Sequence, residues 1–279
     1  IEPRNLEAFV GLADVYTNIN KPMVAQQTYR RALGMQPGHW EAWTNYGRYQ
    51  IETGQFDKAE KSFRKVVART PDSVNAYSNL GAALLYLGDI KQAAKAFSKQ
   101  AELKPSADII SNAATMYYYD GDFERSARMY KMAIELAPQQ CLYWSNLGDA
   151  LHQLPNREEE ARDADEWALD FCDRELEVNP GNHEALLIKS KLLARSGRIE
   201  AALDVVEAYE LLNSQDPLDK LYLALVFVRC GDMQAVKNTL EQAVQQGYPR
   251  RLILVEPEFI PVRDEPWFKT LVDESQSNN

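Results

Sequence analysis

Residues 77–105 read YSNLGAALLYLGDIKQAAKAFSKQAELKP, and the same order of residue types recurs along the chain. A large ring is followed by two polar residues, an apolar residue and a glycine at Trp43–Gly47, Tyr77–Gly81 and Trp144–Gly148. Prolines recur at spacings of 34, 34, 34 and 33 residues, at Pro3, Pro37, Pro71, Pro105 and Pro138. Self-similarity at this period predicts an array of repeated units without one central core.

Each unit contains two stretches of about 12 residues with apolar and small side chains at helical spacing. A glycine separates the two stretches and can end a helix by taking a positive φ, as at Gly54, Gly88 and Gly121. A small residue lets the two helix backbones approach, and an aromatic ring fills the space beside that contact. One unit cannot bury its own apolar face, so stability is expected to come from stacking of neighbours.

At these residues the chain resembles the tetratricopeptide repeat (TPR) family, which is built from 34-residue helix-turn-helix units. The resemblance implies an all-α fold, a right-handed superhelical solenoid of about seven repeats with a C-terminal helical cap. We expect residues 1–5 to end a preceding repeat, so that the natural protein continues upstream. Residues 6–180 are expected to form five units, the fifth with an insertion near residues 152–163. Residues 181–247 then form two weaker units, and residues 248–279 form a capping segment.

The capping segment is rich in proline and carries apolar residues that can close the end of the stack. These are Leu252, Leu254, Phe259, Ile260, Trp267, Phe268 and Leu271. The segment also resembles the end of TPR regions in bacterial signalling proteins, where such an array is joined to a kinase, cyclase or DNA-binding regulator domain.

Composition and motifs argue against several classes of function. The net charge of −10, from 31 basic and 41 acidic residues, disfavours a nucleic-acid partner. The longest apolar run, Leu221–Val228, is too short to insert across a membrane. The histidines fall in three different units, and the cysteines lack metal-ligand spacing, so neither a metal site nor a catalytic constellation is expected. We therefore predict a non-enzymatic chain without cofactors, in the reducing cytoplasm.

The strongest candidate for a functional surface is a row of four asparagines, which we call the carboxamide row. Its members are Asn45, Asn79, Asn112 and Asn146, each two residues before the small packing position. At 100° per residue they point almost opposite to the packing face of the first helix. The TPR resemblance implies that this side lines the concave groove. There a carboxamide can donate to and accept from the backbone of an extended peptide, and the row resembles the asparagine ladder of O-linked N-acetylglucosamine transferase.

Other candidates for groove contacts lie on the same face. Tyr86 and Tyr119 follow their asparagines by seven residues, Tyr118 lies at the margin, and Arg48 is the lone cation, three residues after Asn45. The Tyr86 and Tyr119 rings can bury part of a ligand and still use their hydroxyls. In the alternative interpretation, the asparagines bond to the adjacent helix and the tyrosines pack inside a narrow groove.

Two functions remain open at the level of sequence. The favoured one is a protein- or peptide-binding module, the partner-recognition region of a larger signalling protein. The alternative is structural: homo-oligomerisation through the uncapped first repeat, or a regulatory scaffold for an upstream effector domain. Residues 139–215 hold seven basic and sixteen acidic residues, so the helix expected near residues 157–178 is either a solvated face or a docking site for a basic partner.

Overall fold

The structure is a computed structural model that describes residues 5–212 and 214–273. These residues form sixteen α-helices and one 3₁₀ helix, so the predicted all-α fold is confirmed. None of the helices in the described part of the chain is both long and apolar enough to cross a membrane. The expected contribution of residues 1–4 to a preceding repeat lies outside the described residues.

The first fourteen helices follow the repeats, two helices to each. They are α1 (Leu6–Asn18), α2 (Pro22–Met35), α3 (Trp40–Glu52), α4 (Phe56–Arg69), α5 (Val74–Tyr86), α6 (Ile90–Leu103), α7 (Ala107–Tyr119), α8 (Phe123–Leu136), α9 (Cys141–His152), α10 (Glu158–Val178), α11 (His183–Arg195), α12 (Ile199–Glu210), α13 (Pro217–Cys230) and α14 (Met233–Gln245). After them come α15 (Arg250–Val255), η1 (Pro257–Val262) and α16 (Pro266–Val272).

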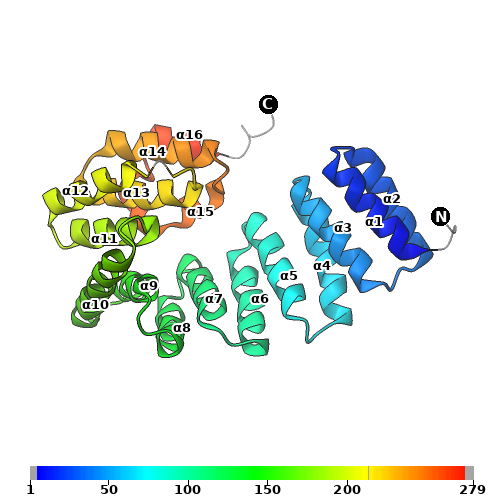
Figure 1. Ribbon diagram of the computed structural model, residues 1–279, viewed down its shortest axis with the longest axis horizontal. Helices are drawn as coiled ribbons and strands as arrows, with labels where there is room; N and C mark the ends of the chain where they lie inside the picture. Colours follow the sequence, from blue (N-terminus) through cyan, green and yellow to red (C-terminus); the bar gives the residue numbers. More distant parts are fainter. Residues whose placement is uncertain (1–4, 213, 274–279) are drawn as a thin grey trace. The chain divides into compact units, whose positions relative to one another are not determined.

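The chain divides into two compact units, with the boundary between Ile109 and Ile110 inside α7. Unit 1 contains α1–α6, and unit 2 contains the rest of α7 and the helices from α8 to α16. In six of the repeats the first helix packs against its own second helix: α1 with α2, α3 with α4, α5 with α6, α9 with α10, α11 with α12 and α13 with α14. Figure 1 shows these pairs following one another along each unit.

Local sequence explains where the helices begin and end. Asn5, Ser73, Asp89 and Asn182 each accept a hydrogen bond from a backbone amide three residues later, which satisfies one free donor of the first turn. The turn glycines have a positive φ, for example 73° at Gly88. In the fifth repeat no such glycine is present, and Asn156 takes the left-handed conformation with a φ of 60°.

The close approach of paired helices in unit 1 depends on a glycine facing a phenylalanine. A Cβ at Gly47 would lie 2.7 Å from the Phe63 ring, and one at Gly81 would lie 2.8 Å from the Phe97 ring. These distances are shorter than side chains tolerate, so the ring occupies the space that a larger residue would need. The role that the sequence assigns to these glycines is therefore confirmed.

The fifth repeat carries its additional length mainly in α10, which has 21 residues where α8 has 14. Ala161, Ala164, Ala168, Phe171 and Cys172 form its buried face. Most acidic residues of its first half are exposed, as expected for a solvated face. Its use as a docking site stays a prediction.

The C-terminal segment, residues 248–273, packs only partly as expected. Leu252, Phe259 and Phe268 are buried, and η1 contacts α13 while α16 contacts α14 and α15. The expectation was wrong for Leu254 and Ile260, which are 45% and 61% exposed. Both line an open cavity together with Tyr118 and Tyr119 at the end of α7.

We expect Gly81→Ala to destabilise unit 1 by about 1–3 kcal/mol, because the new methyl group must displace the Phe97 ring. Gly11→Ala in α1 is the matched control, since a Cβ there meets nothing within 4 Å. That control should stabilise the helix by about 0.5–1 kcal/mol. Urea unfolding followed by circular dichroism measures both, and equal effects would refute the packing argument.

Candidate ligand-binding site

The carboxamide row is not sealed between neighbouring repeats. Asn112 is exposed, and Asn45, Asn79 and Asn146 are half-buried. The packing glycines that follow three of them two residues later are buried. The first helices therefore present their asparagines away from the helix contact, as the spacing predicts.

In unit 1 the carboxamide row has two members, Asn45 on α3 and Asn79 on α5. The Asn45 amide donates to Asp14 Oδ2 of α1 at 3.3 Å, and Asp14 also accepts a hydrogen bond from Tyr29. At Asn45 the structure therefore shows the alternative that the sequence left open, a bond to the adjacent helix. Asn79 is half-buried on α5.

Two further predicted residues of unit 1 are accessible. Arg48 is exposed, and Tyr86 is 43% exposed. The Tyr86 ring stacks on Phe56, with ring centroids 4.8 Å apart and planes 8° apart. This stack fixes the ring orientation while leaving much of the side chain in solvent.

In unit 2 the row leads into a cavity. Asn112 and Asn146 line one cavity of about 220 Å³ together with Tyr118 and Tyr119. We call it the tyrosine cavity. Its other lining residues are Ser111, Thr115, Tyr130, Leu142, Asp149, Glu184, Lys191, Leu218, Leu221, Tyr222, Leu225 and Glu256.

The hydroxyls of Tyr118 and Tyr119 both have partners within the chain, whereas the sequence left the Tyr119 hydroxyl to a ligand. Tyr118 is buried, and its hydroxyl donates to Glu256 Oε1 at 3.2 Å. Tyr119 is half-buried and shares a hydrogen bond with Tyr248. Burial raises the pKa of both tyrosines well above the usual value. The reason is that the C-terminal segment folds back over the end of α7.

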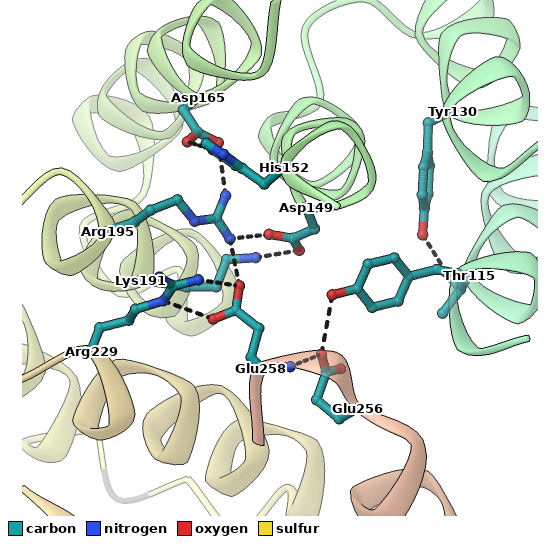
Figure 2. Close-up of polar contacts among 11 residues, drawn as sticks. Thr115, Tyr130, Asp149, His152, Asp165, Lys191, Arg195, Arg229, Glu256 and Glu258 are labelled. Carbon is teal, nitrogen blue, oxygen red and sulfur yellow. Dashed lines mark hydrogen bonds and ion pairs between the residues drawn. The ribbon is translucent and has the colours of Figure 1, made fainter. Parts of the chain in front are cut away.

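Beside the cavity lies a buried set of alternating charges, which we call the acid–base network. It joins α9, α10, α11, α13 and η1, and its members point toward one another in Figure 2. Arg195 contacts Asp149, Asp165 at 2.9 Å and Glu258 at 3.2 Å. Lys191 lies 2.7 Å from Asp149, and Arg229 lies 2.9 Å from Glu258. The network thus ties the C-terminal segment to three repeats.

The network keeps Asp149 and Arg195 ionised. Burial alone would raise the pKa of Asp149, but Lys191 and Arg195 hold it well below its usual range. Burial likewise opposes the charge of Arg195, yet Asp149, Glu258 and Asp165 raise the pKa of the guanidinium. Buried charges of this kind are tolerated because each is paired.

Glu256 is the exception among these buried acids. Burial, together with the nearby charges of Glu258 and Asp149, raises its pKa to about 8. Its side chain accepts hydrogen bonds from Tyr118 and from the Glu258 amide. Within the described residues the ion pairs of the network end at Glu258 and do not reach Glu256.

Sequence reasoning missed Lys191, Arg195 and Glu256. Two of them had a signal, because Ser190 occupies the packing position of the sixth repeat. In that register Lys191 and Arg195 fall three and seven residues after the row position, where Asn45 is followed by Arg48 and Glu52. Glu256 had no such signal, since it lies outside the repeats and reaches the site only through the path of the C-terminal segment.

Residues 9–169 match the family described as the cilia and flagella-associated protein 70 middle TPR-like domain. The chain belongs to this family. TPR-like domains are in general scaffolds for protein interaction and typically have no catalytic activity. No curated protein matches the sequence well enough to count as a relative.

Solved structures share the fold. A tetratricopeptide repeat protein from Parabacteroides merdae has a TM-score of 0.69 at 11% identity, covering 96% of this chain and 99% of its own. A MamA crystal structure has a TM-score of 0.55 at 19% identity, covering 62% and 95%. MamA from Desulfovibrio magneticus has a TM-score of 0.52 at 18% identity, covering 62% and 97%. At these identities the likeness shows the TPR fold alone.

The family match ends at residue 169, before the weaker repeats and the C-terminal segment. The predicted likeness of that segment to bacterial signalling proteins therefore stays a prediction. The predicted repeat boundaries also stay predictions, although the helix pairs fall within them.

Proposed function

We propose that this TPR-like chain binds an extended peptide of a partner protein along the first helices, within a larger cytoplasmic signalling protein. The observation that carries the proposal is that Asn112 and Asn146 line one solvent-open cavity. Consecutive carboxamides one repeat apart offer paired donors and acceptors to a peptide backbone. Because every peptide has the same backbone groups, this kind of recognition depends only weakly on the peptide's sequence.

Unit 1 offers a second set of contacts for the same purpose. Asn79 is half-buried, Arg48 is exposed, and the Tyr86 ring is held in place by Phe56. A fixed and partly exposed ring gives a partner apolar area at little cost in side-chain entropy.

We predict that Asn112→Ala/Asn146→Ala weakens the binding of peptides that the chain selects from an immobilised array. Each lost hydrogen bond contributes about 1 kcal/mol, so the dissociation constant should rise roughly 25-fold for most hits, whatever their sequence. Fluorescence anisotropy on labelled copies of the hits measures the change.

The control for this experiment is Asn75→Ala, an exposed asparagine in the first turn of α5 that is outside the row. It should leave every dissociation constant unchanged. If the selected peptides bind the double variant and the wild type with equal dissociation constants, the proposal that the carboxamide row binds the peptide is refuted.

Self-association is a second candidate function, favoured by an exposed apolar patch on the first helix pair. Val15, Ile19, Met23 and Val24 are 51%, 53%, 68% and 40% exposed. Apolar side chains grouped in this way mark surfaces that pair with another protein.

If the patch pairs two copies of the chain, the mass from light scattering should rise toward that of a dimer with concentration. Ile19→Lys/Met23→Lys should then keep the mass at that of a monomer, because buried ammonium groups oppose the contact. A monomer mass for the wild type at all concentrations would exclude this second function.

A further inference from the structure

We propose that the tyrosine cavity of unit 2 receives a cationic side chain, the ammonium of a lysine or the guanidinium of an arginine on the partner peptide. The inference rests on the proposed function and names the chemistry of the ligand. It is carried by the shape of the cavity, its charge and its aromatic lining.

The cavity has an accessible rim and a buried floor. Asn112 and Glu184 at the rim are exposed, and Leu218 is 41% exposed. Tyr118, Tyr130, Lys191 and Glu256 at the floor are buried. A long side chain can enter at the rim, where Asn112 meets its backbone, and place its charged end near the floor.

The charged groups that line the cavity favour a positive guest. The lining carries three acidic side chains, on Asp149, Glu184 and Glu256, and one basic side chain, on Lys191. Asp149 is already paired with the Lys191 ammonium at 2.7 Å and with the Arg195 guanidinium. The charge that a guest cation would meet at the floor is therefore that of Glu256, whose pKa of about 8 makes it mainly ionised above pH 8. An ionised Glu256 repels a carboxylate ligand, which is therefore disfavoured.

Glu256 is suited to this role by its contacts. Its oxygen accepts from the Tyr118 hydroxyl at 3.2 Å and from the Glu258 amide at 3.3 Å, which fixes the carboxyl group at the cavity floor. The cost of burying an unpaired carboxylate raises the pKa of Glu256 to about 8, and a guest cation would favour its ionised form.

Aromatic rings complete the environment of the guest. Tyr118, Tyr119, Tyr130 and Tyr222 all line the cavity. The Lys191 ammonium already lies 5.7 Å from the centroid of the Tyr222 ring, which shows that a cation fits beside these rings. Faces of tyrosine rings attract both ammonium and guanidinium groups.

The site should respond to pH through Glu256. The titratable and charged groups around it are Tyr118 and Tyr119 from α7, Tyr130 from α8, Asp149 from α9, Lys191 and Arg195 from α11, Tyr222 from α13, and Tyr248, Glu258 and Arg263 from the C-terminal segment. Together they leave its pKa raised to about 8. A cation binds the ionised form, so its affinity should rise as pH increases from 6 to 8.

The test uses the whole chain and four end-blocked pentapeptides, Gly-Ser-Xaa-Ser-Gly, in which Xaa is lysine, arginine, norleucine or glutamate. Dissociation constants are measured by nuclear magnetic resonance titration. We expect the lysine and arginine peptides to bind at least tenfold more tightly than the norleucine peptide at pH 8. The glutamate peptide should bind most weakly.

The decisive variant is Glu256→Gln, whose amide oxygen can keep the hydrogen bonds from Tyr118 and from the Glu258 backbone. It should reduce the preference for lysine over norleucine to less than threefold and remove its pH dependence. Glu207→Gln, on the exposed face of α12, carries the same charge change. It should leave both the preference for lysine over norleucine and the pH dependence of that preference unchanged.

The inference is overturned if no peptide binds, if lysine and norleucine peptides bind equally, or if Glu256→Gln keeps the preference. Its failure is distinguishable from failure of the proposed function. Asn112→Ala/Asn146→Ala should weaken all four peptides by a common factor, whereas Glu256→Gln changes the ratio between them. If Asn112→Ala/Asn146→Ala weakens none of the peptides and the lysine-to-norleucine ratio stays as in the wild type, backbone binding by the row is refuted and the cation site is supported.

Discussion

The architecture of unit 2 depends on the ion pairs that the Arg195 guanidinium makes with three carboxylates. The guanidinium is almost fully buried and contacts carboxylates from α9, α10 and the C-terminal segment. Removing a buried charge from such a network leaves its partners uncompensated, which costs about 3–5 kcal/mol. The network therefore fixes where the C-terminal segment crosses unit 2, and so which hydroxyls and carboxylates face the tyrosine cavity.

The same first-helix positions serve different purposes in the two units. In unit 1, Tyr86 remains 43% exposed. In unit 2, Tyr119 holds the equivalent position seven residues after its asparagine and bonds to Tyr248. The repeat thus supplies an equivalent set of positions, and the C-terminal segment converts the set in unit 2 from an open face into a lined cavity. In our proposal the carboxamide row therefore binds the peptide backbone, and the tyrosine cavity selects a cationic side chain.

Most of the fold could be predicted from sequence because the repeat forces it. The glycines at 47 and 81 leave room for rings at 63 and 97, and this constraint recurs at a fixed interval. The orientation of the four asparagines followed from helical geometry alone. The path of the C-terminal segment could not be predicted, because it depends on long-range ion pairs such as Arg195 with Glu258, which leave no periodic signal. For that reason the sequence left the Tyr119 hydroxyl to a ligand, although it bonds to Tyr248, and missed Glu256.

Amide hydrogen exchange tests most directly whether the Arg195 network holds the C-terminal segment in place. The amides of residues 250–262 should exchange about as slowly as those of α13 in the wild type. They should exchange at least tenfold faster in Arg195→Met, while α8 stays protected and Arg198→Met behaves as the wild type. Slow exchange of residues 250–262 that is identical in the wild type and in Arg195→Met would contradict this account.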